Sequence, residues 1–138
     1  MSGMGLRRFV ARWLEKSQAP PARLPEAEER DYSLAEVGNY DGSDPNKPLL
    51  IVIRGVVYDV TRGRDFYGPG GPYGMFAGRD CTRALATMAF DEELFTGNVE
   101  GLQPDELDQL EEWIQTFEAK YRRVGRLLSE PAEDIGPP

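Results

Sequence analysis

The chain has 138 residues, of which 40% are hydrophobic and 29% charged, and this composition suits one domain with a core of ordinary size. The formal net charge is −8, so we expect no nucleic-acid partner, because phosphate binding needs an excess of clustered Lys and Arg. No segment approaches the roughly 20 consecutive apolar residues of a membrane-spanning helix, and the single cysteine, Cys81, excludes an intramolecular disulfide.

The chain contains no histidine. This absence excludes Ser-His-Asp and Cys-His catalysis, and zinc, iron or haem sites that depend on imidazole. Cys81 therefore lacks a histidine base that would activate it. Glu111 and Glu112 are adjacent on a predicted helix, and adjacent helical residues do not share a face. We expect no catalytic residue and a protein that is not an enzyme.

Residues 1–24 form a basic segment with five Lys and Arg and one Glu. Its apolar residues have the spacing of one helical face: Leu6, Phe9, Val10, Trp13 and Leu14. Three interpretations remain open: the segment docks on the domain, lies on a membrane surface, or is a mitochondrial transit peptide. Residues 17–30 are Pro-rich and polar, as in a linker. We predict a domain at 25–128 and an acidic disordered tail at 129–138.

Between these ends the residue patterns predict a small set of short elements. Ser33 and Glu36 have the spacing of a capping box at a helix start, and Pro104 opens the clearest helix, with cations near its end at Lys120, Arg122 and Arg123. The other expectations are β-rich runs at 49–61 that form a hairpin or a bent strand pair broken at Arg54–Gly55, a short helix at 79–88 capped by Asp80, and a helical turn or loop at 91–95.

The segment at 59–80, "DVTRGRDFYGPGGPYGMFAGRD", combines turn residues with aromatic side chains. Tyr73 lies between Pro72 and Gly74, so turn residues hold its backbone on both sides. A phenolate oxygen is one known ligand of haem iron. From the residues alone, Tyr73 is either such a ligand or a buried core tyrosine.

Three segments closely resemble the membrane-associated progesterone receptor family, the steroid-binding branch of the cytochrome b5-like fold: "GVVYDVT", "GRDFYGPGGPYGMFAGRDCTRALATM" and "FEAKYRRVGRLL". The resemblance covers about residues 31–128. It implies an α+β, cytochrome b5-like fold, in which a small mixed sheet and short helices form a haem pocket.

The resemblance also implies how the cofactor, haem b, is bound. Tyr73 is the expected axial ligand of the haem iron, and Tyr67 is expected near the rim of the pocket. Lys120 is expected to meet a haem propionate through a charge-assisted bond, and Tyr121 to donate a hydrogen bond to the ligating phenolate. The expected cofactor-binding residues are therefore Tyr67, Tyr73, Lys120 and Tyr121, with Tyr73 the metal ligand.

The expected function is that of a haem-binding, steroid- or sterol-linked adaptor that regulates partner haem enzymes such as haem monooxygenases. Two alternatives are an electron carrier of the cytochrome b5 type and a sterol-binding protein that does not need haem. We expect a haem-dependent dimer. The expected location is cytosolic, peripheral on the endoplasmic reticulum or another endomembrane through residues 1–24, with the mitochondrion as the alternative.

Overall fold

The computed structural model describes residues 24–128, so the predicted acidic tail and all but the last residue of the predicted basic segment lie outside the described residues. The helices are α2 (Leu34–Val37), α3 (Arg64–Tyr67), α4 (Thr82–Thr87) and α5 (Pro104–Lys120). The strands are β1 (Leu50–Ile53), β2 (Val56–Asp59), β3 (Arg79–Asp80) and β4 (Arg122–Arg126). Short 3-10 helices occupy η1 (Thr61–Gly63), η2 (Gly74–Phe76) and η3 (Glu92–Leu94).

The strands form one mixed sheet in the order β3-β1-β2-β4. β1 and β2 are an antiparallel hairpin, β2 pairs with β4 in the antiparallel sense, and β3 runs parallel to β1. The hairpin turns at Arg54 and Gly55, which have φ angles of 48° and 78°. Two successive positive φ values match the right-handed twist of the flanking strands. The predicted hairpin and the predicted α+β class, a small mixed sheet with short helices, are confirmed.

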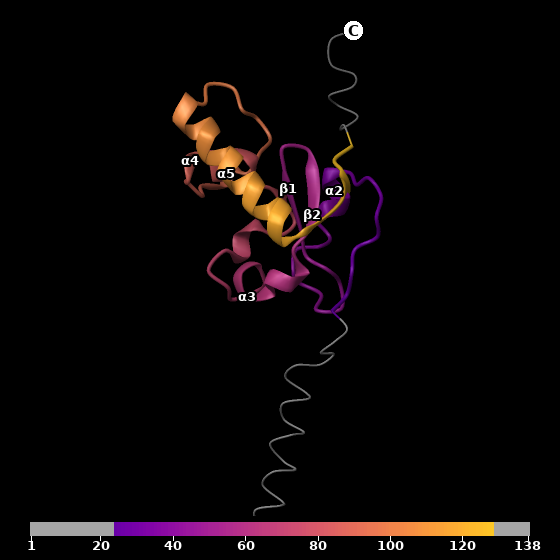
Figure 1. Ribbon diagram of the computed structural model, residues 1–138. Coiled ribbons are helices and arrows are strands. Elements are labelled where there is room, and N and C mark those ends of the chain that lie inside the picture. Colours follow the sequence, from indigo (N-terminus) through magenta and orange to yellow (C-terminus); the bar gives the residue numbers. More distant parts are fainter. Residues whose placement is uncertain (1–23, 129–138) are drawn as a thin grey trace, which may run out of the picture.

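The two faces of the sheet bury different sets of side chains because alternate strand residues point to opposite sides. On one face Ile51, Ile53 and Tyr58 pack in a core that includes residues of α3, α4 and α5. On the other face Leu50 and Val52 join a smaller core with residues of α2 and the preceding chain. Figure 1 shows α5 and α2 on opposite sides of the hairpin.

The chain before α2 packs against the edge strand β4. The backbone N–H of Arg30 donates to the carbonyl of Val124 at 2.9 Å, and Tyr32 forms a parallel bridge with Leu127. A Cβ at Gly125 would lie 1.7 Å from the Arg30 carbonyl oxygen, so only glycine allows this approach. Residues 27–30, which we assigned to a linker, therefore lie against the sheet, where the Ala27 N–H donates to Asp59 at 2.9 Å.

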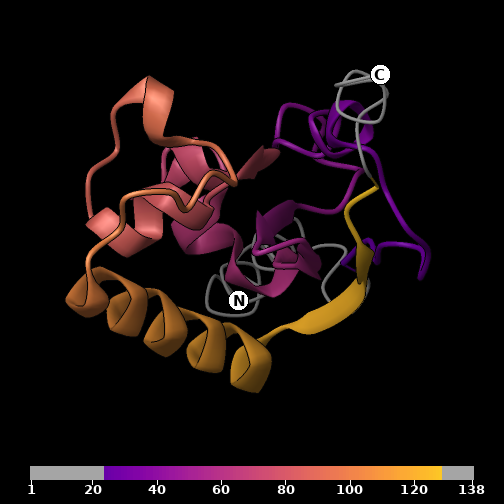
Figure 2. The same cartoon turned by 90° about the horizontal axis from the view of Figure 1, so that it is seen from above.

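Helix α5 begins as predicted but ends earlier. Pro104 is its first residue, and the Glu106 carboxylate accepts the backbone N–H of Gln103 at 2.8 Å. The helix stops at Lys120, and the chain passes directly into β4, as Figure 2 shows. Arg122 and Arg123 lie near the helix end, as expected, but as residues of β4.

The predicted N-cap of α4 is also wrong. Asp80 belongs to β3, and the residue before the helix is Cys81. Asp80 still binds the first helical residue, because its carboxylate accepts the backbone N–H and the hydroxyl of Thr82 at 3.1 and 2.6 Å. Asp80 thus makes the hydrogen bond of an N-cap side chain, although it lies one residue before the N-cap position at Cys81.

Replacing Leu110 with Ala in α5 is expected to lower the free energy of unfolding by about 3 kcal/mol, because its side chain is fully buried and its removal leaves a cavity. Leu107→Ala is the matched control, since Leu107 lies on the same helix but is 38% exposed. We expect the control to lose less than about 1 kcal/mol. Urea unfolding of both variants measures the difference, and equal losses would contradict the described packing of α5.

The stability of the domain is expected to fall as the pH rises above about 10, where free tyrosine loses its proton. Burial, and the hydrogen bond that the Tyr58 hydroxyl donates to Glu118 at 2.6 Å, raise the pKa of Tyr58. Unfolding above pH 10 therefore releases a proton from Tyr58 and becomes more favourable. Denaturant unfolding of Tyr58→Phe between pH 8 and about 11 should show a shallower decline than the wild type; an unchanged pH slope would speak against the raised pKa.

Candidate functional site

The glycine- and proline-rich segment after α3 folds back on that helix through its own backbone. The N–H of Tyr73 donates to the carbonyl of Phe66 at 2.8 Å, and that of Gly71 donates to the carbonyl of Gly68 at 3.0 Å. A Cβ at Gly71 would lie 2.6 Å from the Phe66 oxygen, closer than any side chain allows. Gly71 therefore permits the close approach that places Tyr73 beside the core.

Tyr73 belongs to a group of rings that we call the aromatic cluster: Tyr67, Tyr73, Phe76, Phe90, Phe117 and Tyr121. The ring of Tyr73 lies 5.2 Å from that of Phe76 and 6.2 Å from that of Tyr67, between centroids. Tyr73 itself is partly buried, whereas Tyr67 and Phe76 belong to the core beneath it. Tyr73 thus packs against the core while part of its surface stays accessible, as is also true of Tyr121.

Tyr67 and Tyr121 interact with each other. Their ring centroids are 6.1 Å apart, and the Tyr67 hydroxyl donates a hydrogen bond to that of Tyr121. Burial, with a contribution from Tyr121, raises the pKa of Tyr67, and burial also raises the pKa of Tyr121. Both phenols are therefore held in the neutral, protonated form.

Two expectations about this pair differ from the structure. Tyr67 is only 6% exposed, so it lies in the core and not near the rim of a pocket. Tyr121 was expected to bind the phenolate of Tyr73, but its partner among the described residues is Tyr67, which lies between the two. The hydroxyl of Tyr121 rests over Gly63, where a Cβ would lie 2.5 Å from it. Residue spacing carries no signal for this arrangement.

Tyr73 is the tyrosine of the aromatic cluster whose hydroxyl has no hydrogen-bond partner within residues 24–128. Two tyrosines that do not belong to the cluster have partners. The Tyr32 hydroxyl donates to the backbone carbonyl of Glu28 at 2.7 Å, and the Tyr58 hydroxyl donates to the Glu118 carboxylate at 2.6 Å. A tyrosine hydroxyl next to apolar surface normally finds a partner. The oxygen of Tyr73 is therefore available to a ligand.

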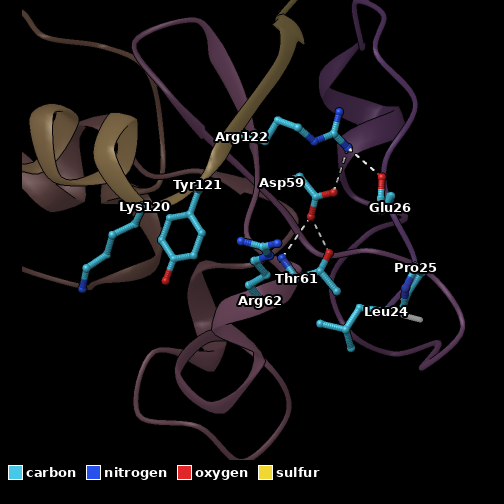
Figure 3. Close-up of a pocket in the computed structure, with 9 residues that line it drawn as sticks. All are labelled: Leu24, Pro25, Glu26, Asp59, Thr61, Arg62, Lys120, Tyr121 and Arg122. Atoms are coloured by element: carbon cyan, nitrogen blue, oxygen red, sulfur yellow. Dashed lines mark hydrogen bonds and ion pairs between the residues drawn. The ribbon is translucent and has the colours of Figure 1, made fainter. Parts of the chain in front are cut away.

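Lys120, the fourth predicted residue, lines a cavity of about 500 Å³ between the α5–β4 junction, the β2–η1 junction and residues 24–26 (Figure 3). Its other lining residues are Leu24, Pro25, Glu26, Asp59, Thr61, Arg62, Tyr121 and Arg122. Tyr121 thus belongs to both the cavity and the aromatic cluster, whereas Tyr67 and Tyr73 do not line the cavity. The four predicted residues are joined through Tyr121.

Asp59 organises the inner wall of this cavity. Its carboxylate accepts the N–H of Thr61 at 3.0 Å, the Thr61 hydroxyl, and the guanidinium of Arg122 at 3.5 Å (Figure 3). Sequence patterns do not group Asp59, Arg62 and Arg122, because these residues come from separate elements. Asp59 is the last residue of β2, and no residue pattern singled it out as a site residue.

The residues present fit a flat, acidic, iron-containing group better than a bare metal ion. Within the described residues no group of three or more Cys, Asp or Glu side chains is placed to hold a metal ion. Tyr73 offers one free phenol oxygen beside aromatic rings, and such an oxygen is an established ligand for haem iron. The exposed Lys120 adds a cation for an acidic substituent.

Residues 24–128 contain no helix that is both long enough and apolar enough to cross a membrane.

The chain is similar in sequence to several known proteins. The chain is 50% identical over 119 residues to "Membrane steroid-binding protein 1" of Oryza sativa subsp. japonica, covering 86% of this chain and 49% of that protein. It is 38% identical over 145 residues to human "Membrane-associated progesterone receptor component 2", covering 94% of this chain and 65% of that protein. The chain therefore spans about half to two thirds of the length of these relatives.

A shorter relative and a solved structure match over nearly their whole length. "Probable steroid-binding protein 3" of Arabidopsis thaliana is 44% identical over 99 residues, which are 72% of this chain and 99% of that protein. An Arabidopsis thaliana structure described as having a cytochrome b5 like fold superimposes with a TM-score of 0.67 at 41% identity, covering 78% of this chain and 98% of that one.

The model of the family described as "Cytochrome b5-like Heme/Steroid binding domain" matches residues 33–127, which include the aromatic cluster and most of the cavity wall. The fold expected from the sequence is thereby confirmed as cytochrome b5-like. The chain belongs to the family of cytochrome b5-like haem/steroid-binding domains, in the branch of the membrane steroid-binding proteins and membrane-associated progesterone receptor components.

Proposed function

We propose that this chain is a non-catalytic haem-binding protein in which the phenolate oxygen of Tyr73 holds the iron. The observation that carries the proposal is the free hydroxyl of Tyr73, because the other two tyrosines of the aromatic cluster are bonded to each other. The chain has no histidine, so imidazole ligation of the iron is not available to it. Ligation by a single tyrosinate is consistent with the site.

Each residue of the site then has a separate task. Tyr73 is oriented by its backbone bond to Phe66 and by the ring of Phe76 beneath it. Tyr67 and Tyr121 are bonded to each other, which leaves the Tyr73 hydroxyl as the one of the three that is open to the iron. Lys120 gives a charge-assisted bond to an acidic group at the haem edge. Haem b, when bound, would supply a ferric iron stabilised by the phenolate charge.

The names of the relatives support a wider role. They are described as steroid-binding proteins and receptor components, which are binding functions. We propose that the chain is a steroid- or sterol-linked adaptor that regulates partner haem enzymes such as haem monooxygenases. We further propose the domain limits 25–128 and a cytosolic position at an endomembrane surface reached through residues 1–24.

Tyr73→Phe is expected to lower haem affinity by about 100-fold or more, since even loss of an outer-shell partner of a metal ligand costs 10–100-fold. Only one hydroxyl without a partner is removed, so the circular dichroism spectrum and thermal melt should not change. Absorption titration with ferric haem measures the affinity. Tyr40→Phe is the matched control, because the Tyr40 hydroxyl also has no partner among residues 24–128 but lies beside the other core. Equal affinity of the wild type and Tyr73→Phe would refute the proposed ligand.

The bound haem is expected to stay ferric in the presence of mild reductants, because an anionic phenolate donates charge to the iron and lowers the reduction potential. A spectroelectrochemical titration of the haem complex measures this potential. Ready reduction by a cytochrome b5 reductase would instead favour the electron-carrier function. Tight binding of a neutral steroid together with no haem binding would favour the haem-independent sterol-binding function.

A further inference from the structure

We propose that the cavity of about 500 Å³ beside Tyr121 is a carboxylate-binding site in which Arg62, together with Lys120, binds the acid. Its volume is in the usual range of small-molecule sites, about 300–1,000 Å³. The carboxylate has two candidate sources, a propionate of the haem or the acid group of a separate amphipathic ligand. In the first case the inference rests on the proposed haem binding.

The charges of the cavity wall leave two cations without partners. Arg122 forms ion pairs with Glu29 at 3.0 Å, with Asp59 at 3.5 Å and with Glu26 at 3.9 Å, so its charge is already compensated by carboxylates. Arg62 and Lys120 have no ion pair or side-chain hydrogen bond with any described residue. Arg62 and Lys120 are therefore the two cations of the cavity lining that remain open to an anionic group.

The position of Arg62 is determined by its neighbours on both sides. Thr61 is buried and bound through its N–H and hydroxyl to Asp59, and Gly63 is buried beneath the Tyr121 hydroxyl. Arg62 itself is exposed, so a rigid turn carries a free guanidinium at the cavity wall. A guanidinium binds a carboxylate through two parallel N–H bonds, which adds directional specificity.

Tyr121 connects this cavity with the candidate haem site. In Figure 3 its ring lies between the side chains of Lys120 and Arg62. The same ring contacts Tyr67 at 6.1 Å and Phe117 at 5.3 Å between centroids, within the aromatic cluster. Leu24 and Pro25 supply apolar surface elsewhere in the cavity wall. The cavity thus suits a group that is acidic at one end and apolar at the other.

The test uses the full chain as wild type, Arg62→Gln and Lys120→Gln, with Arg54→Gln as the charge-matched control. Arg54 is exposed in the turn of the β1–β2 hairpin and does not line the cavity. Each protein is titrated with ferric haem and with haem dimethyl ester, whose propionates carry no charge. Cholate, a steroid carboxylate, is titrated without haem by calorimetry, and thermal melts confirm that each variant is folded.

We expect Arg62→Gln and Lys120→Gln each to weaken carboxylate binding by about fivefold, the effect of losing one partly solvated charged hydrogen bond. Arg54→Gln should equal the wild type. A loss with haem that disappears with the dimethyl ester identifies the propionate as the bound acid. A loss with cholate but not with haem identifies a separate ligand.

The inference is overturned if Arg62→Gln binds both haem and cholate as tightly as the wild type does. This failure is distinct from failure of the proposed function, in which ferric haem does not bind to the wild type or binds equally to Tyr73→Phe. The cholate titration still decides the carboxylate site in that case, because it contains no haem. An equal loss of haem and dimethyl ester binding in Arg62→Gln would also reject the carboxylate contact.

Discussion

The backbone of Gly71 lies so close to the end of α3 that a Cβ there would be 2.6 Å from the Phe66 oxygen and 2.7 Å from the Asp65 oxygen. This approach lets the Tyr73 N–H bind the same Phe66 oxygen, and so brings the Tyr73 ring over Phe76 and Tyr67. Any larger residue at position 71 would push the loop away from α3 and move Tyr73 off the core. The candidate haem site depends on this contact between two pieces of backbone.

The tyrosines of the site are then distinguished by their partners. Tyr67 and Tyr121 bind each other, and burial raises the pKa of both. Tyr73 keeps a free hydroxyl at the partly buried edge of the cluster. On the far side of Tyr121, the network around Asp59 neutralises Arg122 and leaves Arg62 and Lys120 free. Tyr121 therefore lies where the aromatic cluster meets the part of the cavity that carries the free cations Arg62 and Lys120.

Local patterns predicted the elements that local interactions stabilise. The hairpin turn at Arg54–Gly55 and the start of α5 at Pro104 follow from the conformations of those residues. Tyr73 was found through its flanking turn residues and the family resemblance. Contacts between distant segments were not predictable in this way: the pairing of Tyr121 with Tyr67 depends on how α5 crosses the sheet, and the role of Arg62 depends on which cations Asp59 neutralises. The strand at 122–126 was missed for the same reason, because pairing with β2 overrides its helical context.

The central claim is that the oxygen of Tyr73 holds the haem iron, and the resonance Raman spectrum of the ferric haem complex tests it most directly. The protein is prepared with ordinary and with ring-deuterated tyrosine, and the spectrum is excited in the phenolate-to-iron charge-transfer band. We expect phenolate ring modes that shift on deuteration and are absent from Tyr73→Phe. A wild-type spectrum without tyrosine modes, or tyrosine modes that persist in Tyr73→Phe, would contradict it.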